Sequence, residues 1–262
     1  MLESLVLGMV QGITEWLPVS SQGSVSAVGS FIFGLSLADA ASFALWLHLG
    51  TATSALIAFR REIFDLSRDS LCDPLHPSPL LRFGVVGTAA SVMIGVPVLL
   101  TLDDLSTAFG AGGMLVVGVA MLGTAVALRA RFEGGTRTRR DLSMMDAMAF
   151  GLAQGFAAIP GLSRSGLTVS MLLGRGIDRG EALAVSFLMS IPVSLGAALF
   201  AVLDGVGIGL IEGLVGAAVS AIVGLVSIKT LLAVAQRLNF TTFVGAVAVA
   251  VIAGSTAQVF WF

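Results

Sequence analysis

Long apolar blocks separated by short polar interruptions make up most of this chain. Blocks of about 20 apolar residues are long enough to cross a bilayer as helices, and strands of a membrane barrel would instead alternate over about 10 residues. We predict full spans at residues 40–59, 83–102, 112–130, 182–203, 209–235 and 240–261, and shorter apolar helices at 2–17 and 145–159. The pattern therefore predicts an all-α, polytopic helical membrane protein with a single transmembrane domain over residues 1–262.

Serine- and glycine-rich segments follow both short helices. These segments, residues 18–30 and 160–174, begin at Pro18 and Pro160. Irregular backbone at membrane depth is tolerated only where it is buried in protein or lines a wet cavity. We therefore expect two re-entrant segments that meet near the centre of the membrane.

The two halves of the chain resemble each other. Gln11 and Gln154 lie 143 positions apart, and so do Gly23 and Gly166. Each half runs from a short helix through a proline and a serine-glycine segment into three long spans. This predicts an internal repeat with halves at about 1–130 and 145–262, and interrupted helices at matching places indicate a site near the membrane midplane.

Composition and charge narrow the class further. Hydrophobic residues make up 56% of the chain, charged residues only 11%, and the mean hydropathy is +0.99. Soluble domains carry about 25% charged residues. The net charge of −2 gives no basic surface for nucleic acid, and the single Cys72 excludes an intrachain disulfide. The arginine-rich loops 60–82 and 129–140 flank two spans, which places both on the cytoplasmic side.

An arginine stands in the second polar segment, in residues 160–166 (PGLSRSG). An unpaired arginine at membrane depth costs a few kcal/mol at least, so Arg164 indicates a site. Its planar fork of donors suits phosphate oxygens. Ser163, Ser165 and Gly166 add neutral donors where a helix would restart, so the segment has the chemistry of a phosphate cradle.

A carboxylate stands at the matching place in the first half. Gln11 and Glu15 are four residues apart and share one helix face. Glu15 has the chemistry to hold a divalent cation or to act as a base, and the alternative is a buried salt bridge with Arg164; both roles are compatible. Ser20 and Ser21 follow, and either offers a nucleophile or a helix cap.

The runs at 11–23 (QGITEWLPVSSQG) and 160–166 resemble the two signature motifs of the undecaprenyl-diphosphatase family of the bacitracin-resistance type. The similarity continues through residues 49–51, 59–61 and 181–196 and covers essentially the whole chain. The resemblance implies an inverted repeat in the plasma membrane with an active site open to the outer side. It also implies Mg²⁺- or Ca²⁺-supported hydrolysis of undecaprenyl (polyprenyl) diphosphate to the monophosphate and inorganic phosphate.

The resemblance also assigns residues. Gln11 and Glu15 match the two acidic positions of the first motif, the first of which is Glu or Gln in the family. Ser21 matches the proposed nucleophile and Arg164 the phosphate-binding arginine. We predict Glu15, Ser21 and Arg164 as catalytic, Glu15 and Gln11 as metal ligands, and Ser20, Ser163, Ser165 and Gly166 as phosphate-binding.

One departure from the family pattern matters. Bacterial members usually read Ser-Ser-x-Gly-His, whereas Ser24 follows Gly23 here. Three outcomes stay open: Glu15 takes the base role through metal-bound water, His48 enters the pocket, or hydrolysis is lost and lipid-phosphate binding is kept. Taken alone, His48 is interpreted as structural. The alternative function is a polyprenyl-phosphate flippase; the prenyl chain length, the metal and a homodimer also stay open.

Overall fold

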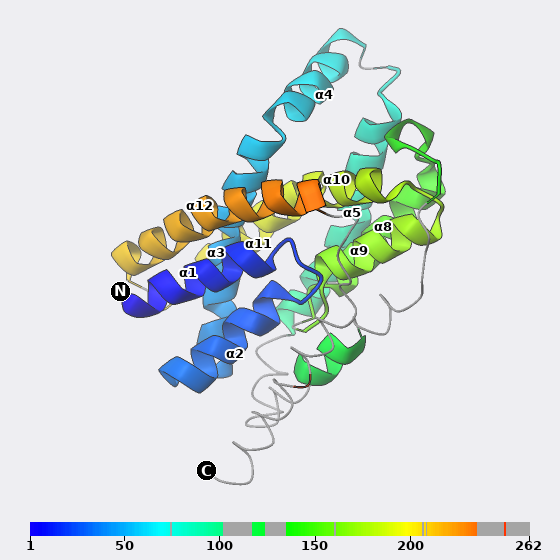
Figure 1. Cartoon of the computed structure of the whole chain (residues 1–262). Helices are drawn as coiled ribbons and strands as arrows, with labels where there is room; N and C mark the ends of the chain where they lie inside the picture. The colour runs from blue at the N-terminus through cyan, green and yellow to red at the C-terminus, as the bar shows by residue number, and fades with distance from the viewer. Residues whose placement is uncertain are drawn as a thin grey trace.

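The computed structural model describes residues 1–73, 75–101, 117–123, 135–159, 161–205, 207, 209–234 and 249. This part of the chain is built of helices (Figure 1). They are α1 (Leu2–Thr14), α2 (Ser21–Phe33), α3 (Leu37–Ala58), α4 (Arg60–Cys72), α5 (Pro79–Leu100), the short 3₁₀ helix η2 (Arg139–Asp141), α8 (Met144–Phe156), α9 (Arg164–Gly174), α10 (Arg179–Leu188), α11 (Ser190–Asp204) and α12 (Leu210–Val234).

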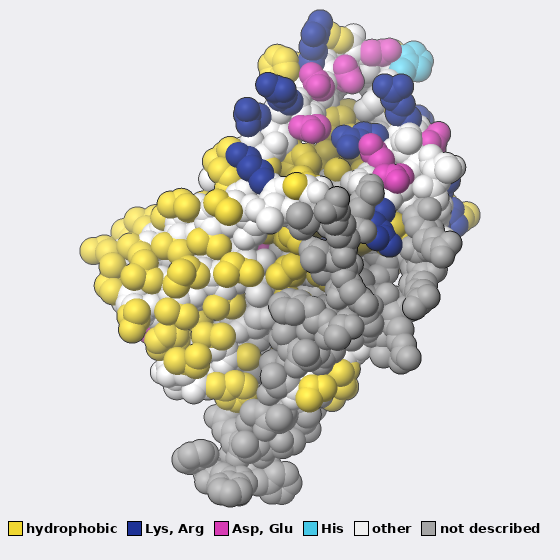
Figure 2. All heavy atoms as spheres, in the orientation of Figure 1, with side chains coloured by type: hydrophobic (Ala, Val, Ile, Leu, Met, Phe, Trp, Pro, Cys, Tyr) yellow, Lys and Arg dark blue, Asp and Glu magenta, His cyan; other side chains and the backbone are white. Residues whose placement is uncertain are grey.

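Four helical segments of this part are long and apolar enough to cross a membrane. They are Leu37–Ala58, Pro79–Leu100, Arg179–Leu203 and Leu210–Ala233. Figure 2 shows apolar side chains over the face that carries α1 and α12, and charged side chains gathered at the end that carries α4. The described parts of both arginine-rich loops lie at this polar end (Figure 1). The all-α membrane fold is therefore confirmed.

One predicted boundary was wrong, and the reason is physical. Residues 60–72 form a helix rather than a loop, because the charges that stop a membrane span do not stop a helix. Ile63 and Leu66 give α4 an apolar face against the core. The predicted span 182–203 is confirmed within the apolar segment Arg179–Leu203, which is divided into α10 and α11 at Met189. Span 240–261 and most of 112–130 lie outside the described residues.

The polar segments after α1 and α8 interrupt the helical chain, and we call these two interruptions the helix breaks. A serine caps the helix that follows each break. The side-chain oxygen of Ser20 accepts from the Gly23 amide at 3.2 Å at the start of α2. The side-chain oxygen of Ser163 accepts from the Gly166 amide at 3.1 Å at the start of α9. Both caps satisfy an amide that a helix start leaves without an internal partner. The polar segments therefore break the chain and restart it as helices at two corresponding places.

The short helix of each half of the chain packs on a long helix of the other half. The first helix, α1, packs on the last described helix, α12, while α8 packs on α5. Glycines permit both contacts: a Cβ on Gly12 would lie 2.8 Å from the Gly224 nitrogen, and one on Gly151 would lie 2.5 Å from the Gly87 oxygen. Small residues are what allow membrane helices to approach this closely. Each half thus supplies the neighbour of the other half's short helix.

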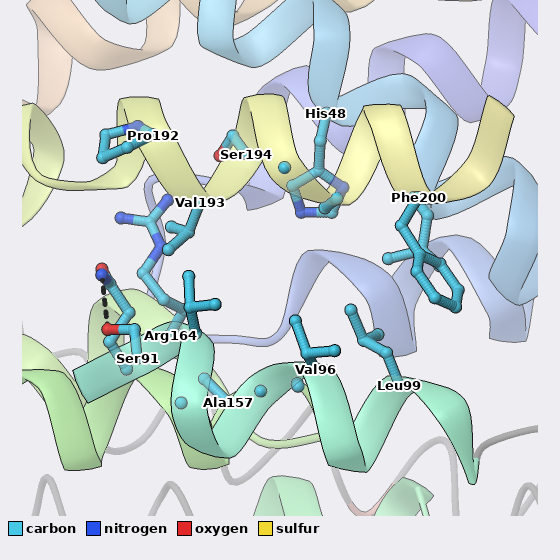
Figure 3. Close-up of a pocket in the computed structure, with 18 of the residues that line it drawn as sticks. His48, Ser91, Val96, Leu99, Ala157, Arg164, Pro192, Val193, Ser194 and Phe200 are labelled. Carbon is cyan, nitrogen blue, oxygen red and sulfur yellow. Dashed lines mark hydrogen bonds between the residues drawn. The ribbon is translucent and has the colours of Figure 1, made fainter. Parts of the chain in front are cut away.

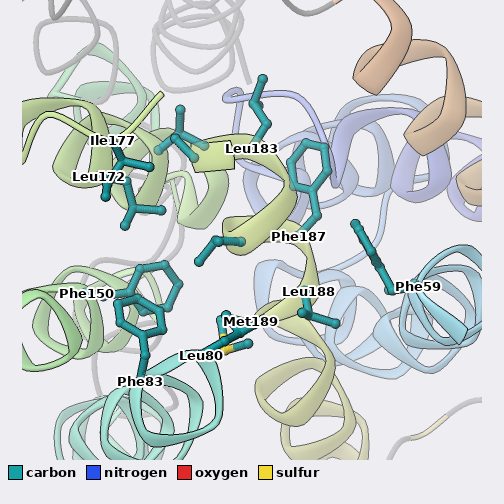
Figure 4. Packing of buried hydrophobic residues seen from close by; sticks show 14 of the residues in the cluster. Phe59, Leu80, Phe83, Phe150, Leu172, Ile177, Leu183, Phe187, Leu188 and Met189 are labelled. Atoms are coloured by element: carbon teal, nitrogen blue, oxygen red, sulfur yellow. The ribbon is translucent and has the colours of Figure 1, made fainter. Parts of the chain in front are cut away.

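An aromatic and aliphatic core holds α5, α8, α9 and α10 together (Figure 4). The rings of Phe83 and Phe150 lie 5.0 Å apart between α5 and α8. The rings of Trp16 and Phe187 meet edge-on at 5.3 Å, which joins the first helix break to α10. Such ring pairs add to the packing energy and fix orientation. This core supports the breaks that carry the polar motifs.

Candidate active site

Glu15 is the centre of the polar site. It directly follows α1, and its side chain is only 3% exposed. One carboxylate oxygen, Oε2, accepts from the Ser21 hydroxyl at 2.6 Å and from the Gln11 amide nitrogen at 3.0 Å. The other oxygen, Oε1, accepts from the Arg164 guanidinium. A buried carboxylate needs such partners to stay charged, and both halves of the chain supply them.

Arg164 reaches this carboxylate from the first residue of α9. Its side chain is 13% exposed, and a second nitrogen donates to the Ser186 carbonyl at 3.3 Å. The salt bridge with Glu15 that the sequence left as an alternative is thus present. A guanidinium carries five N–H groups, and two of them are used by these contacts. The pairing therefore leaves Arg164 donors for an anion.

Ser20 joins the two helix breaks. It has a positive φ of 58°, which is uncommon for a residue with a Cβ. Its hydroxyl oxygen accepts from the Gly23 amide of its own helix and from the Gly161 amide of the other break, each at 3.2 Å. Residues held in such a conformation are stabilised by their surroundings. In this structure, Ser20 positions the two polar segments against each other.

Ser163 and Ser165 are also engaged with the protein. The Ser165 hydroxyl donates to the Leu17 carbonyl at 2.8 Å, and the side-chain oxygens of Ser163 and Ser165 lie 3.2 Å apart. Because Ser165 gives its only hydrogen to Leu17, its oxygen accepts from Ser163. The amide of Gly166, the remaining predicted phosphate donor, is used in the cap with Ser163. All four predicted phosphate-binding residues thus lie at the helix breaks beside Arg164, and their phosphate role stays a prediction.

His48 lies in the same site. Its Nε2 atom is 3.4 Å from Glu15 Oε2, and its Nδ1 atom is 2.7 Å from the Ala44 carbonyl oxygen. A carbonyl only accepts, so Nδ1 carries a hydrogen and Nε2 faces the carboxylate. Ser24, at the position of the family's usual histidine, instead donates to the Ser20 carbonyl at 2.9 Å. A histidine is therefore present in the site, but it comes from α3.

A cavity of about 290 Å³ opens beside this cluster (Figure 3). Glu15, His48 and Arg164 line one part of it. The walls beyond are apolar and come from α5 and α11, with Leu99 and Phe200 at the far part in Figure 3. Polar groups concentrated at one part of an otherwise apolar cavity suit a ligand with an anionic head and an apolar tail.

The oxygen donors of the site fit a divalent cation. Glu15 Oε1 accepts one hydrogen bond, and Gln11 Oε1 is buried with no partner among the described residues. Carboxylate and amide oxygens are the ligands that Mg²⁺ and Ca²⁺ take. No cluster of three or more His, Cys, Asp or Glu was found in the part of the chain that the structure describes. A cation held here would complete its ligands with phosphate oxygens and water.

Four further polar residues, which were not predicted as site residues, line the cavity: Gln22, Ser91, Gln154 and Ser194. Gln22 lies inside the first motif and Gln154 repeats Gln11 at the matching position, so the sequence held a signal for these two. Ser91 and Ser194 are single serines in apolar spans, and nothing in the sequence separates them from packing residues.

The fold and the site define a polytopic membrane protein with a polar, ion-paired site buried where two helix breaks meet. A family model described as "Bacitracin resistance protein BacA" matches residues 4–253. The chain belongs to this family.

Curated relatives agree with this assignment. A protein named "Undecaprenyl-diphosphatase" from Methanococcoides burtonii is 38% identical over 253 residues, covering 92% of this chain and 93% of its own. One of the same name from Methanopyrus kandleri is 37% identical over 246 residues, covering 91% and 90%. A third, from Methanothrix thermoacetophila, is 36% identical over 244 residues, covering 92% of each chain.

Proposed function

We propose that this protein hydrolyses a polyprenyl diphosphate to the polyprenyl monophosphate and inorganic phosphate. One observation carries the proposal: Glu15, Arg164 and His48 border a cavity whose other walls are mostly apolar, and the Ser21 hydroxyl donates to Glu15. The curated relatives are named for the diphosphatase reaction, and they match this chain over nearly its whole length.

Arg164 binds the terminal phosphate in this proposal. Its N–H groups not used by Glu15 and Ser186 are free to donate to phosphate oxygens. The guanidinium is held in place before the substrate arrives, so little reorganisation accompanies the charge that develops during transfer. Phosphoryl transfer depends mainly on this kind of positioning and charge stabilisation.

Ser21 attacks the terminal phosphorus. Its hydroxyl already donates to Glu15 at 2.6 Å, so the proton passes to the carboxylate as the oxygen–phosphorus bond forms. The bond from phosphorus to the bridging oxygen breaks, Glu15 gives the proton to the departing oxygen, and the prenyl monophosphate leaves. Water then attacks the phosphoserine, releases inorganic phosphate and returns a proton to Ser21. Both steps use the same carboxylate as the proton acceptor.

The remaining charge would be balanced by a divalent cation, Mg²⁺ or Ca²⁺. Among the charged groups that line the cavity, Arg164 and Glu15 cancel, which leaves a diphosphate poorly compensated. Glu15 and Gln11 would hold the ion, and the ion would supply charge neutralisation at the phosphate oxygens. His48 lies 3.4 Å from Glu15 Oε2 and takes the place of the family's usual histidine.

The substrate's apolar part lies along α5 and α11 in this proposal. Val96, Leu99, Phe200 and Leu203 line that part of the cavity. A long isoprenoid chain, such as C55, continues from there into the surrounding lipid of the cell membrane. The cavity therefore contacts only the diphosphate head and the first part of the prenyl chain. Activity should depend only weakly on the length of the prenyl chain.

Phosphate release from purified protein in detergent tests the proposal. The substrates are a C55 and a shorter polyprenyl diphosphate, each with and without Mg²⁺ or Ca²⁺. We expect release that depends on the cation and is lost in Arg164→Ala. Arg139→Ala is the matched control, because Arg139 forms an ion pair with Glu181 away from the cavity and should leave release unchanged.

The flippase alternative gives a different result in the same assay. It predicts that the wild type binds the lipid but releases no phosphate under any cation. Release by Arg164→Ala at the wild-type rate would also contradict the proposed mechanism. Rapid quenching with a substrate labelled on the terminal phosphate tests the nucleophile: label should stay on the wild-type protein and be absent from Ser21→Ala.

A further inference from the structure

Ser194 has an unused hydroxyl in the wall of the cavity. The residue is 3% exposed, lies on α11 and lines the cavity together with Glu15, His48 and Arg164. Among the described residues its hydroxyl has no hydrogen-bond partner. Serines within helices usually donate to a carbonyl one turn earlier. Ser190 on the same helix does so, with its hydroxyl 2.6 Å from the Phe187 carbonyl oxygen.

A second polar group faces the cavity from α5 and α8. Ser91 donates to the Gly87 carbonyl at 2.7 Å, so its oxygen can only accept from the Gln154 amide 3.1 Å away. This contact fixes the side-chain nitrogen of Gln154 toward Ser91 and uses one of its two hydrogens. Gln154 is 4% exposed and also lines the cavity. The second N–H is therefore a donor without a partner among the described residues.

The position of these groups along the cavity is specific. Figure 3 shows α11 and α5 as opposite walls, with Ser194 and Ser91 toward the part that holds Arg164. Phe200 and Leu99 follow on the same two helices toward the apolar part. In this view Ser194 lies between Arg164 and Phe200, whereas Ser91 lies on the side of Arg164 away from Leu99 and Phe200.

A prenyl diphosphate has three parts in a fixed order: terminal phosphate, inner phosphate and chain. If the terminal phosphate binds at Arg164 and the chain lies between Leu99 and Phe200, the inner phosphate falls at the level of Ser194. Neutral hydroxyl and amide donors suit an anion that must be bound without excess positive charge. We propose that Ser194 binds the phosphate that stays on the prenyl chain.

This inference rests on the proposed function, and product inhibition separates the two phosphates. The monophosphate product keeps the inner phosphate, whereas inorganic phosphate represents the terminal one. For Ser194→Ala we expect the inhibition constant of C55 monophosphate to rise about tenfold, as for one lost hydrogen bond to a charged group. The inhibition constant of inorganic phosphate should change less than twofold. Ser194→Thr keeps the hydroxyl and should keep the wild-type values.

The control is Ser190→Ala, a buried serine of the same helix that does not line the cavity. The inference would be overturned if Ser194→Ala had the same inhibition constant for C55 monophosphate as the wild type. A rise in the inhibition constant of inorganic phosphate alone would also overturn it. If the wild type releases no phosphate, the proposed function fails instead. Direct binding of C55 monophosphate, measured as thermal stabilisation of wild type and Ser194→Ala, then still tests the site.

Discussion

The guanidinium of Arg164 donates to the carboxylate of Glu15, which joins the first residue of α9 to the residue that follows α1. The two residues are far apart in the chain and come from matching helix breaks. Glu15 is buried and Arg164 is partly buried, and each is the charge that makes the other tolerable at membrane depth. The pair therefore supports both the fold and the chemistry of the site.

Removing one member of this pair should cost both activity and stability. We expect Arg164→Ala to lower phosphate release at least about 100-fold, because an electrostatic donor is lost. It should also lower the free energy of unfolding by about 3 kcal/mol, because the buried Glu15 carboxylate loses its guanidinium partner. Activity assays and thermal unfolding in detergent measure the two effects.

The double variant Glu15→Gln with Arg164→Gln separates the roles. It removes both charges, so it should regain part of the lost thermal stability while phosphate release stays absent. A double variant that regains both stability and release would mean that the pair is only structural.

His48 should matter for turnover although it is outside both motifs. It faces Glu15 Oε2 and lines the cavity. We expect His48→Gln to lower phosphate release about 100-fold, the size typical of a lost acid–base or charge-positioning partner. His76→Gln is the control, since His76 lies on the exposed surface. Release within twofold of wild type in His48→Gln would contradict this role.

Ser20 should contribute mainly to stability. Ser20→Ala removes the acceptor of two amides, those of Gly23 and Gly161, and keeps the strained backbone. We expect a loss of about 2 kcal/mol or more in the free energy of unfolding. Ser24→Ala should cost less, because the Ser20 carbonyl keeps its bond from the Ser24 backbone amide. Equal unfolding temperatures for the two variants would count against the joining role of Ser20.

Asp146 should make stability depend on acid pH. Burial raises its pKa, but hydrogen bonds from Arg137, Arg175 and Ser143 outweigh burial and hold the pKa below its usual value of 3.8. Its contribution is therefore complete above about pH 3.8 and is lost as pH falls through the lower, folded-state pKa. Asp146→Asn should be less stable at pH 6, and the difference from wild type should shrink at lower pH. Unfolding temperatures measured across this range check the sign.

The contact of α8 with α5 should tolerate no added methyl group. A Cβ on Gly151 would lie 2.5 Å from the Gly87 carbonyl oxygen, so Gly151→Ala must push the helices apart. We expect a lower unfolding temperature, with a cost of about 1–3 kcal/mol for overpacking. Gly196→Ala is the control, because a Cβ there meets nothing within 4 Å.

The sequence by itself determined the class of the protein and most of its site. Apolar length fixes membrane helices because the backbone must satisfy its own hydrogen bonds in lipid. The matching serine-glycine breaks and the lone Arg164 indicated the site because such residues are too costly at that depth to be incidental. Glu15 and Arg164 could be paired from the sequence because each requires an opposite charge.

The tertiary structure decided what one-dimensional patterns do not contain. His48 looked like a structural residue because its approach to Glu15 depends on how α3 packs against α1. Ser91 and Ser194 looked like packing residues because only the opposition of α5 and α11 places them in one cavity. The charged run at residues 60–72 was predicted to be a loop because charged residues do not enter the lipid. Charged residues do form helices outside the lipid, and the apolar face of this helix is recognised only from its packing against the core.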